Sequence, residues 1–157
     1  MSEQSTVHST FVIERSYPKP PARVFSAFSN AVQKRRWYAG GEMHDLEQFD
    51  LDFRVGGVER FQYRFKEGSP FPGVSLVNEG RYQDIVPDRR IVTAATMDLG
   101  DKRISASLVT IELVPTENGT DLICTHQGIF FEGADGPQMR EAGWRKLLEN
   151  LAAELTA

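Results

Sequence analysis

The order of hydrophobic and polar residues predicts a chain that begins with one strand and two short helices. Residues 8–17 alternate, with Phe11 and Ile13 on one face, which is the period of a half-buried strand. The prolines that follow end this strand. Proline is tolerated in the first turn of a helix, because its missing N–H would have no partner there. We therefore predict a short helix over residues 22–28 and a second one, capped by Asn30, that ends at residues 37–38.

From residue 49 onward the hydrophobic period is two, which predicts six further strands. The first pair is predicted at residues 49–55 and 58–65, joined by a tight turn in which Gly56 and Gly57 supply positive φ angles. A longer loop that contains Phe71 follows. The remaining strands are expected at residues 74–86, 91–98, 103–114 and 120–130.

The end of the chain has a helical period instead. Its apolar residues form one stripe, made of Trp144, Leu147, Leu148, Leu151 and Leu155. Gly143 lies inside this helix, where glycine costs about 1 kcal/mol relative to alanine. We expect it either to allow a close approach to aromatic rings of the sheet or to widen the mouth of a pocket.

One long sheet and one long amphipathic helix predict an α+β protein of the helix-grip type. Its seven-stranded antiparallel sheet is expected to curve around the C-terminal helix, with two short helices after the first strand. We expect residues 8–157 to form this single domain and residues 1–7 to be disordered. A sheet of this length curls around its helix and tends to leave space between the two.

Composition narrows the class of protein. The 157 residues are 40% apolar, which suffices for one core, and the net charge of −4 is unlike a basic nucleic-acid surface. No apolar run approaches the ~20 residues of a membrane span, and the N-terminus lacks a signal-peptide pattern. The single cysteine, Cys124, excludes an internal disulfide and is expected to be a buried small hydrophobe. The sequence thus predicts a cytoplasmic protein with no membrane or nucleic-acid partner.

Several short segments match one protein family in order and composition. They are FVIER (11–15), PARVF (21–25), RWY (36–38), FRVGG (53–57), EGRY (79–82), IVP (85–87), GTDL (119–122) and residues 143–151. Together they resemble the activator of heat-shock-protein-90 ATPase homologue family, within the START and birch-pollen-allergen-like (SRPBCC) superfamily that also holds polyketide cyclases. The resemblance covers residues 8–155 and implies the helix-grip fold. It also implies that a chaperone is a possible partner, although the separate N-terminal domain of the eukaryotic co-chaperones is not expected here.

Aromatic residues are predicted to gather on the concave face of the sheet, under the last helix. The ligand-binding residues that we predict there are Trp37, Phe49, Phe53, Phe61, Tyr63, Phe65, Tyr82, His126, Trp144 and Leu148. A buried tyrosine hydroxyl needs a hydrogen-bond partner, so we expect Tyr63 and Tyr82 to orient a ligand and Trp37 to lie near the mouth. The alternative is that these residues form an ordinary core.

Polar residues on the same face give further candidates. Arg15 is in phase with Phe11, so it points either into the space under the helix or outward to water at the fringe. His126 shares its strand face with Cys124 and is either a pocket acid or base or a core histidine. His44 is expected in a solvated acidic loop. The histidines have no metal-ligand spacing and no glycine-rich phosphate loop precedes a helix, so we expect no metal and no cofactor.

These observations leave three functions open. The favoured one is binding of a small apolar or amphipathic molecule between sheet and helix, with no catalytic residue. An enzyme of the polyketide cyclase or dehydratase type would instead use His126 or Arg15 to move protons, and would need a perturbed pKa in the pocket. A chaperone-interaction module would need an exposed apolar patch outside the cavity, for instance at Phe71.

Overall fold

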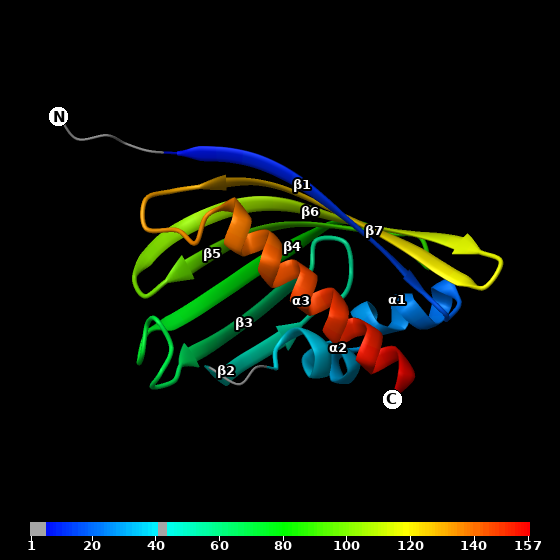
Figure 1. Ribbon diagram of the computed structural model, residues 1–157, viewed down its shortest axis with the longest axis horizontal. Coiled ribbons are helices and arrows are strands. Elements are labelled where there is room, and N and C mark those ends of the chain that lie inside the picture. Colours follow the sequence, from blue (N-terminus) through cyan, green and yellow to red (C-terminus); the bar gives the residue numbers. More distant parts are fainter. Residues whose placement is uncertain (1–5, 41–43) are drawn as a thin grey trace.

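The computed structural model describes residues 6–40 and 44–157, whose elements follow one another in the predicted order (Figure 1). They are β1 (Val7–Tyr17), α1 (Pro21–Ser29), α2 (Ala31–Tyr38), β2 (His44–Leu51), β3 (Val58–Phe65), β4 (Ser75–Val86), β5 (Arg90–Leu99), β6 (Lys102–Thr116), β7 (Gly119–Phe130) and α3 (Pro137–Thr156). The expectation of a disordered N-terminus falls mainly on residues 1–5, which lie outside the described residues, and β1 begins at Val7.

The strands of the described residues form one antiparallel sheet in the order β1-β7-β6-β5-β4-β3-β2. From β2 to β7 each strand pairs with its neighbour along the chain, because short connections favour antiparallel hairpins. Strand β1 instead pairs with β7, so that Phe11 lies opposite His126. Helices α1 and α2 make the long connection between the two edges of the sheet. The predicted α+β class and strand arrangement are confirmed.

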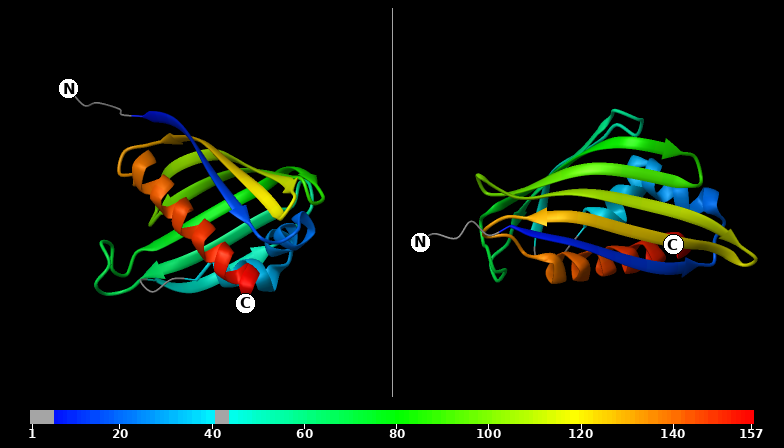
Figure 2. Two further views of the ribbon diagram at one scale, coloured as in Figure 1. Left: turned by 45° about the vertical axis from the view of Figure 1, so that its right-hand side comes forward. Right: turned by 90° about the horizontal axis from the view of Figure 1, so that it is seen from above.

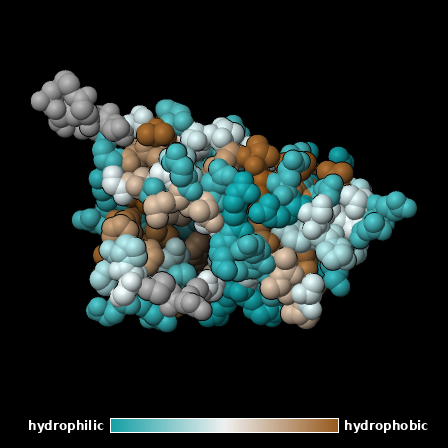
Figure 3. Space-filling view, viewed as in Figure 1, coloured by the Kyte–Doolittle hydropathy of each residue, from teal (hydrophilic) through white to brown (hydrophobic). Residues whose placement is uncertain are grey.

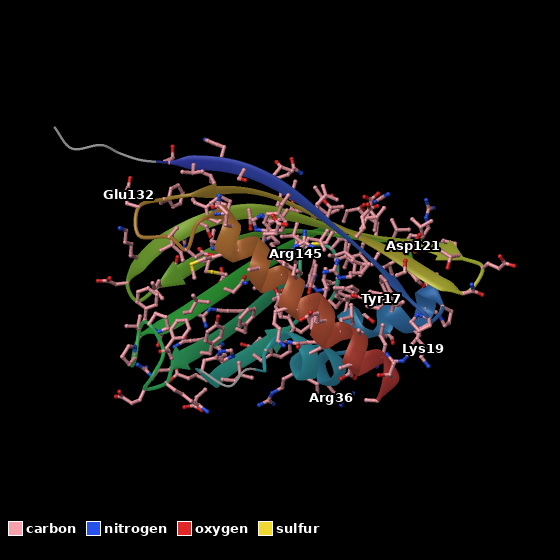
Figure 4. The ribbon with its side chains drawn as sticks, in the orientation of Figure 1. Tyr17, Lys19, Arg36, Asp121, Glu132 and Arg145 are labelled. Atoms are coloured by element: carbon pink, nitrogen blue, oxygen red, sulfur yellow. The ribbon has the colours of Figure 1, made fainter. Side chains whose placement is uncertain are left out.

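Helix α3 runs diagonally across the concave face of the curved sheet, with α1 and α2 beside its C-terminal end (Figures 1 and 2). The predicted stripe is buried against the sheet at Trp144, Leu148, Leu151 and Leu155, while Leu147 is half-buried. The Tyr17 hydroxyl, which lies between β1 and α3 in Figure 4, donates to the Leu148 carbonyl oxygen at 2.9 Å. The core therefore lies between α3 and the sheet, as predicted.

Local signals place the two short helices. The Asn30 side chain accepts a hydrogen bond from the Gln33 backbone N–H at 3.0 Å, which confirms the predicted cap of α2. The Trp37 indole N–H donates to the Ala27 carbonyl oxygen at 2.8 Å and so joins α2 to α1. On the outer side of α2, Arg36 forms an ion pair with Glu154 at 2.6 Å, which holds α2 against the last turns of α3.

The predicted first hairpin is wrong in its details. Strand β2 begins at His44 and ends at Leu51, so the predicted strand over residues 49–55 is shifted. Only Gly56 of the glycine pair has a positive φ, of 85°. The Gly56 N–H donates to the Tyr82 carbonyl and the Tyr82 N–H to the Gly57 carbonyl, at 2.8 and 3.0 Å. This backbone pairs with β4 and cannot close a two-residue turn.

Gly143 corrects a second expectation. A Cβ built on this residue meets no atom within 4 Å, and Gly143 is exposed on the outer side of α3. Close approach to aromatic rings is therefore not the reason for this glycine. None of the described helices is long and apolar enough to cross a membrane.

Candidate functional site

A cavity lies between α3 and the centre of the sheet, and the space-filling view shows a hollow on this face beside α3 (Figure 3). The space open to the centre of a water molecule is about 50 Å³. Its walls are Phe28, Lys34, Tyr38, Glu59, Asn78, Ile91, Thr93, Ala95, Thr96, Met97, Ser107, Val109, Ile111, His126, Arg140 and Trp144. All three helices and strands β3 to β7 contribute, so the cavity exists only in the folded molecule.

A line of small residues crosses the sheet at this place. In the strand register Gly80 lies opposite Ala95, Ala95 opposite Ser107, and Ser107 opposite Gly128. We call these four residues, on β4 to β7, the small-residue row. Larger side chains occupy the neighbouring positions on both sides, for example Met97 and Val109. The space at the two glycines is occupied, because Thr93 Cγ2 lies 2.7 Å from the Cβ position of Gly80 and His126 Cε1 lies 2.8 Å from that of Gly128. Ala95 and Ser107, at the centre of the row, line the cavity.

Glu59 continues this row on β3 and forms a buried ion pair with Lys34 of α2. Both residues are 5% exposed. The Tyr82 hydroxyl donates to the same carboxylate oxygen, Glu59 Oε1, at 2.8 Å, and the Lys34 ammonium lies 4.4 Å from the centre of the Tyr38 ring. Burial and the adjacent Glu59 carboxylate raise the pKa of Tyr38 and of Tyr82 well above its ordinary value. The phenol groups of Tyr38 and Tyr82 therefore stay protonated beside the ion pair of Lys34 and Glu59.

A second ion pair lies where α3 begins. Arg140 donates from Nε and Nη2 to the two carboxylate oxygens of Asp135, each at 2.8 Å, and from Nη2 to Ser105 Oγ at 3.0 Å. Its guanidinium also lies 5.0 Å from the centre of the Phe130 ring. Bidentate pairing with Asp135 compensates the charge of Arg140 inside the cavity wall.

His126 is the third polar group of the cavity, and it is 1% exposed. Its ring stacks on Phe11 with 4.7 Å between ring centres and an angle of 5°. Burial, and secondarily the Arg140 guanidinium, lowers the pKa of His126 to about 4, so the imidazole is neutral at neutral pH. No described residue forms a hydrogen bond with its Nδ1 atom.

Two of the predicted ligand-binding residues, His126 and Trp144, line the cavity. The structure places Trp37 in the core between the helices, 2% exposed, and not at a mouth. Tyr82 does not line the cavity, and its hydroxyl donates a hydrogen bond to Glu59. Leu148 is fully buried one turn after Trp144.

The other predicted aromatic residues lie toward the β2 edge of the sheet. Phe61 is buried and packs edge-on against Tyr38, with 5.2 Å between ring centres. Tyr63 and Phe65 continue this cluster along β3 and are half-buried, as is Phe49 on β2. Phe53 follows β2 and packs against Phe25 and Tyr82.

The cavity residues that were not predicted from the sequence include Lys34, Tyr38, Glu59 and Arg140. A signal existed for Glu59, because it lies two residues before Phe61 in a strand whose alternate residues face inward. Lys34 and Arg140 carry no such signal. Long charged side chains on helices normally face water, and only the packing of the helices on the sheet directs these two inward.

The remaining sequence candidates have ordinary surroundings. Arg15 lies at the fringe and donates to the Glu14 carbonyl oxygen at 2.9 Å. Cys124 is buried as predicted, and burial raises the pKa of its thiol to about 12. His44 lies in β2 and stacks on Tyr63, so the predicted solvated loop is wrong there. Phe71 is 46% exposed, with its ring centre 6.1 Å from that of Phe65, so the loop partly folds back onto its own hairpin.

The cavity therefore offers a ligand apolar contacts and hydrogen bonds. Among residues 6–40 and 44–157, no group of three or more His, Cys, Asp or Glu side chains is arranged to hold a metal ion. The charged groups of the lining, Lys34, Glu59 and Arg140, are each paired with an opposite charge.

Comparison with known structures shows that this architecture is shared. A protein from Rhizobium leguminosarum is 37% identical, with a TM-score of 0.90 and 99% of each chain covered. The Mll3558 protein from Rhizobium loti is 47% identical, with a TM-score of 0.84 over 96% of this chain and 99% of that one. The AHSA1-like protein from Aeromonas hydrophila is 19% identical, with a TM-score of 0.68 over 94% and 92%, and shares the fold.

No curated protein matches the chain. The family model described as Activator of Hsp90 ATPase homolog 1-like protein matches residues 18–156, from the end of β1 to the last turn of α3. This span contains both ion pairs, His126 and the whole small-residue row. The resemblance inferred from the sequence is thereby confirmed, and the chain belongs to the activator of Hsp90 ATPase homolog 1-like family.

Proposed function

We propose that the protein binds a small apolar or amphipathic molecule in the cavity between the sheet and α3. One observation carries this proposal: the fold leaves a space whose walls are apolar, at Ile91, Val109 and Trp144 for example, with a few convergent polar groups. Binding pockets have this composition because the apolar wall supplies affinity and the polar groups fix the orientation of the ligand.

The size of the space limits the size of the ligand. The space open to the centre of a water molecule is about 50 Å³, which is about a third of the ~150 Å³ of a dry cavity that binds benzene. A molecule with one ring is therefore the largest expected ligand, and its binding requires the cavity walls to move apart.

The cavity residues favour a carrier or sensor over an enzyme. A general acid or base works best when its pKa lies near the operating pH. The His126 imidazole, with a pKa of about 4, is a weak base at neutral pH. The charges of Lys34 and Arg140 are taken up by carboxylates.

A chaperone-contacting role is less well supported. Among the exposed large apolar residues of the described chain, Val7 and Val12 lie on β1, and the others lie on different elements and loops: Val32, Val55, Phe71, Val114 and Met139. The cytoplasmic location stays part of the proposal, since the one cysteine is a buried free thiol.

The test is titration with toluene and phenol, followed by NMR of the Met97 methyl group, which lies in the cavity wall. We expect saturable shifts of this signal and a higher melting temperature with ligand excess, because a ligand that binds only the folded state stabilises it. Ala95→Leu should weaken both ligands at least ~10-fold, since its side chain fills the small-residue row.

The matched control is Ala94→Leu. Ala94 is adjacent in β5 and its side chain points to the opposite face of the sheet, so binding should be unchanged. The proposal is wrong if neither compound shifts the Met97 signal, or if the two leucine variants bind both compounds as the parent does.

A further inference from the structure

We infer that the cavity binds the carbonyl group of a small uncharged molecule, with the Tyr38 hydroxyl and the Asn78 amide as hydrogen-bond donors. This inference rests on the proposed function and adds to it the chemical class of the ligand and the residues that recognise it. Three features carry it: two polar side chains without a partner among the described residues, further donors on Arg140, and the pairing of the charges.

Tyr38 places a hydroxyl without a partner in the cavity wall. Its ring centre lies 5.2 Å from that of Phe61 and 6.0 Å from that of Trp144, so the ring is held between the sheet and α3. No described residue forms a hydrogen bond with the hydroxyl. Among the described residues, His126 Nδ1 is the one unpartnered side-chain nitrogen or oxygen that water cannot reach, so the Tyr38 hydroxyl is accessible.

The groups that act on the Tyr38 hydroxyl surround it on several sides. Burial raises the pKa of Tyr38 most, followed by Glu59, Tyr63 and Cys124, whereas the Arg140 guanidinium lowers it. Glu59 and Tyr63 lie on β3, Cys124 on β7 and Arg140 on α3. A hydroxyl that both β3 and β7 influence lies over the middle of the sheet. Because its pKa is well above the ordinary value, the phenol keeps its proton and can donate it.

Asn78 is the second polar side chain of this kind. It lines the cavity, and its amide has no hydrogen bond to any described residue and is not shut off from water. In the strand register Asn78 lies between Phe61 of β3 and Met97 of β5. Residues opposite each other in an antiparallel pair have Cβ atoms ~4.5–5.5 Å apart. Since Phe61 also packs against Tyr38, the amide and the hydroxyl border the same part of the cavity.

Arg140 adds donors that no described residue accepts. It donates from Nε and Nη2 to Asp135 and from Nη2 to Ser105, which leaves the two N–H groups of Nη1. Ser105 lies opposite Met97, and Met97 opposite Asn78, so Arg140 borders the same row of residues from the β7 side. A carbonyl oxygen has two lone pairs and needs no acceptor in return, so it complements a wall with more donors than acceptors.

The pairing of the charges favours an uncharged ligand. Both carboxylate oxygens of Asp135 bind Arg140, and Lys34 pairs with Glu59. A carboxylate in the cavity would lose its hydration, find no uncompensated cation in the described lining and lie close to Glu59, which is strongly unfavourable. The carbonyl group of a ketone or an amide avoids this cost.

Cyclopentanone and methylenecyclopentane test this directly, because they have nearly the same shape and differ in C=O against C=CH₂. Titration is followed at the Met97 methyl signal. We expect the ratio of dissociation constants, methylenecyclopentane over cyclopentanone, to fall at least ~3-fold in Tyr38→Phe and in Asn78→Leu, since each variant lacks one hydrogen bond. Tyr63→Phe removes a hydroxyl that does not line the cavity and should keep the parent ratio.

A second pair of compounds tests the charge of the ligand. Isobutyramide and isobutyrate have the same shape, and only isobutyrate is charged at neutral pH. We expect isobutyramide to bind at least ~10-fold more tightly, because isobutyrate loses the hydration of its charge in the cavity.

The side-chain amide signals of Asn78 in the parent protein provide a measurement that does not depend on the folding of a variant. We expect cyclopentanone to move the amide proton signals downfield and methylenecyclopentane to move them much less. The inference is wrong if both compounds move these signals alike, if either Tyr38→Phe or Asn78→Leu keeps the parent ratio, or if isobutyrate binds as well as isobutyramide. In each of these cases saturable binding of methylenecyclopentane still supports the proposed function, whereas the absence of binding by every compound overturns both.

Discussion

The buried polar residues of the described chain include members of two ion pairs and one side chain with an unpartnered atom. Lys34 with Glu59, and Arg140 with Asp135, are ion pairs largely removed from water, and deleting one partner of such a pair typically costs ~3–5 kcal/mol. Each pair also joins two parts of the fold: α2 to β3, and the loop after β7 to α3. His126 is the exception, since its ring is buried without a partner for Nδ1.

The buried state of His126 predicts a pH dependence of stability. Its pKa is about 4 in the folded protein and ~6.5 in an unfolded chain. Between these values the unfolded chain binds more protons, so the free energy of unfolding should fall as the pH decreases from ~6.5 to 4. The His126 contribution is on the order of 3 kcal/mol over this range.

Urea unfolding at a series of pH values from 7.5 to 4.5 measures this effect. His126→Phe should have a shallower pH dependence than the parent, whereas His8→Phe should follow the parent. If the free energy of unfolding depends on pH in the same way for the parent and for His126→Phe, the His126 ring has a similar pKa in the folded and the unfolded protein, which would contradict this prediction.

At the scale of elements, α3 closes the core and the cavity together. One face carries Trp144, Leu148, Leu151 and Leu155 into the sheet, and the ion pair of Arg36 with Glu154 holds its last turns against α2. The opposite face is exposed and includes Gly143, which has no contact that requires glycine. The adjacent residues Gly143 and Trp144 thus lie on opposite faces of α3, one exposed and one in the core.

Substitutions at these two residues should change stability in opposite directions. Trp144→Ala removes a large core side chain and should lower the free energy of unfolding by ~3–5 kcal/mol. Gly143→Ala should raise it by ~0.5–1 kcal/mol, because alanine favours the helix and no atom obstructs the added Cβ. Chemical denaturation measures both, and a destabilising Gly143→Ala would contradict the described packing.

At the scale of the whole molecule, the helices and the sheet share one core. The buried cluster includes Phe28 of α1, Trp37 of α2, Trp144 of α3 and Ile13 of β1. Strand β1 and helix α3 lie at opposite ends of the chain, yet the Tyr17 hydroxyl bonds to the Leu148 carbonyl. No layer therefore has a separate core of its own.

This shared core predicts cooperative unfolding. Both tryptophans lie in the core, so their emission reports the helix layer, while far-UV circular dichroism reports mainly the sheet. The two signals should have the same midpoint in urea, as in a two-state transition. An earlier fluorescence transition would mean that the helices leave the sheet while it remains folded.

The sequence by itself determined the elements and their order. Alternation along β3 and β7 and the stripe of α3 are local periodicities, and burial on one face of an element follows directly from them. The Asn30 cap was likewise readable, because capping depends on residues three apart. Two members of the candidate site, His126 and Trp144, could be predicted for the same reason.

The tertiary structure alone decided what the cavity contains. The small-residue row joins residues from four strands, and only the register between strands brings Gly80, Ala95, Ser107 and Gly128 into line. Lys34 and Arg140 point inward because each pairs with a carboxylate there, the buried Glu59 on another element and the partly buried Asp135 just before α3. Periodicity describes one element at a time, whereas a cavity is a relation between elements, so its position and polarity depend on how the helices pack against the sheet.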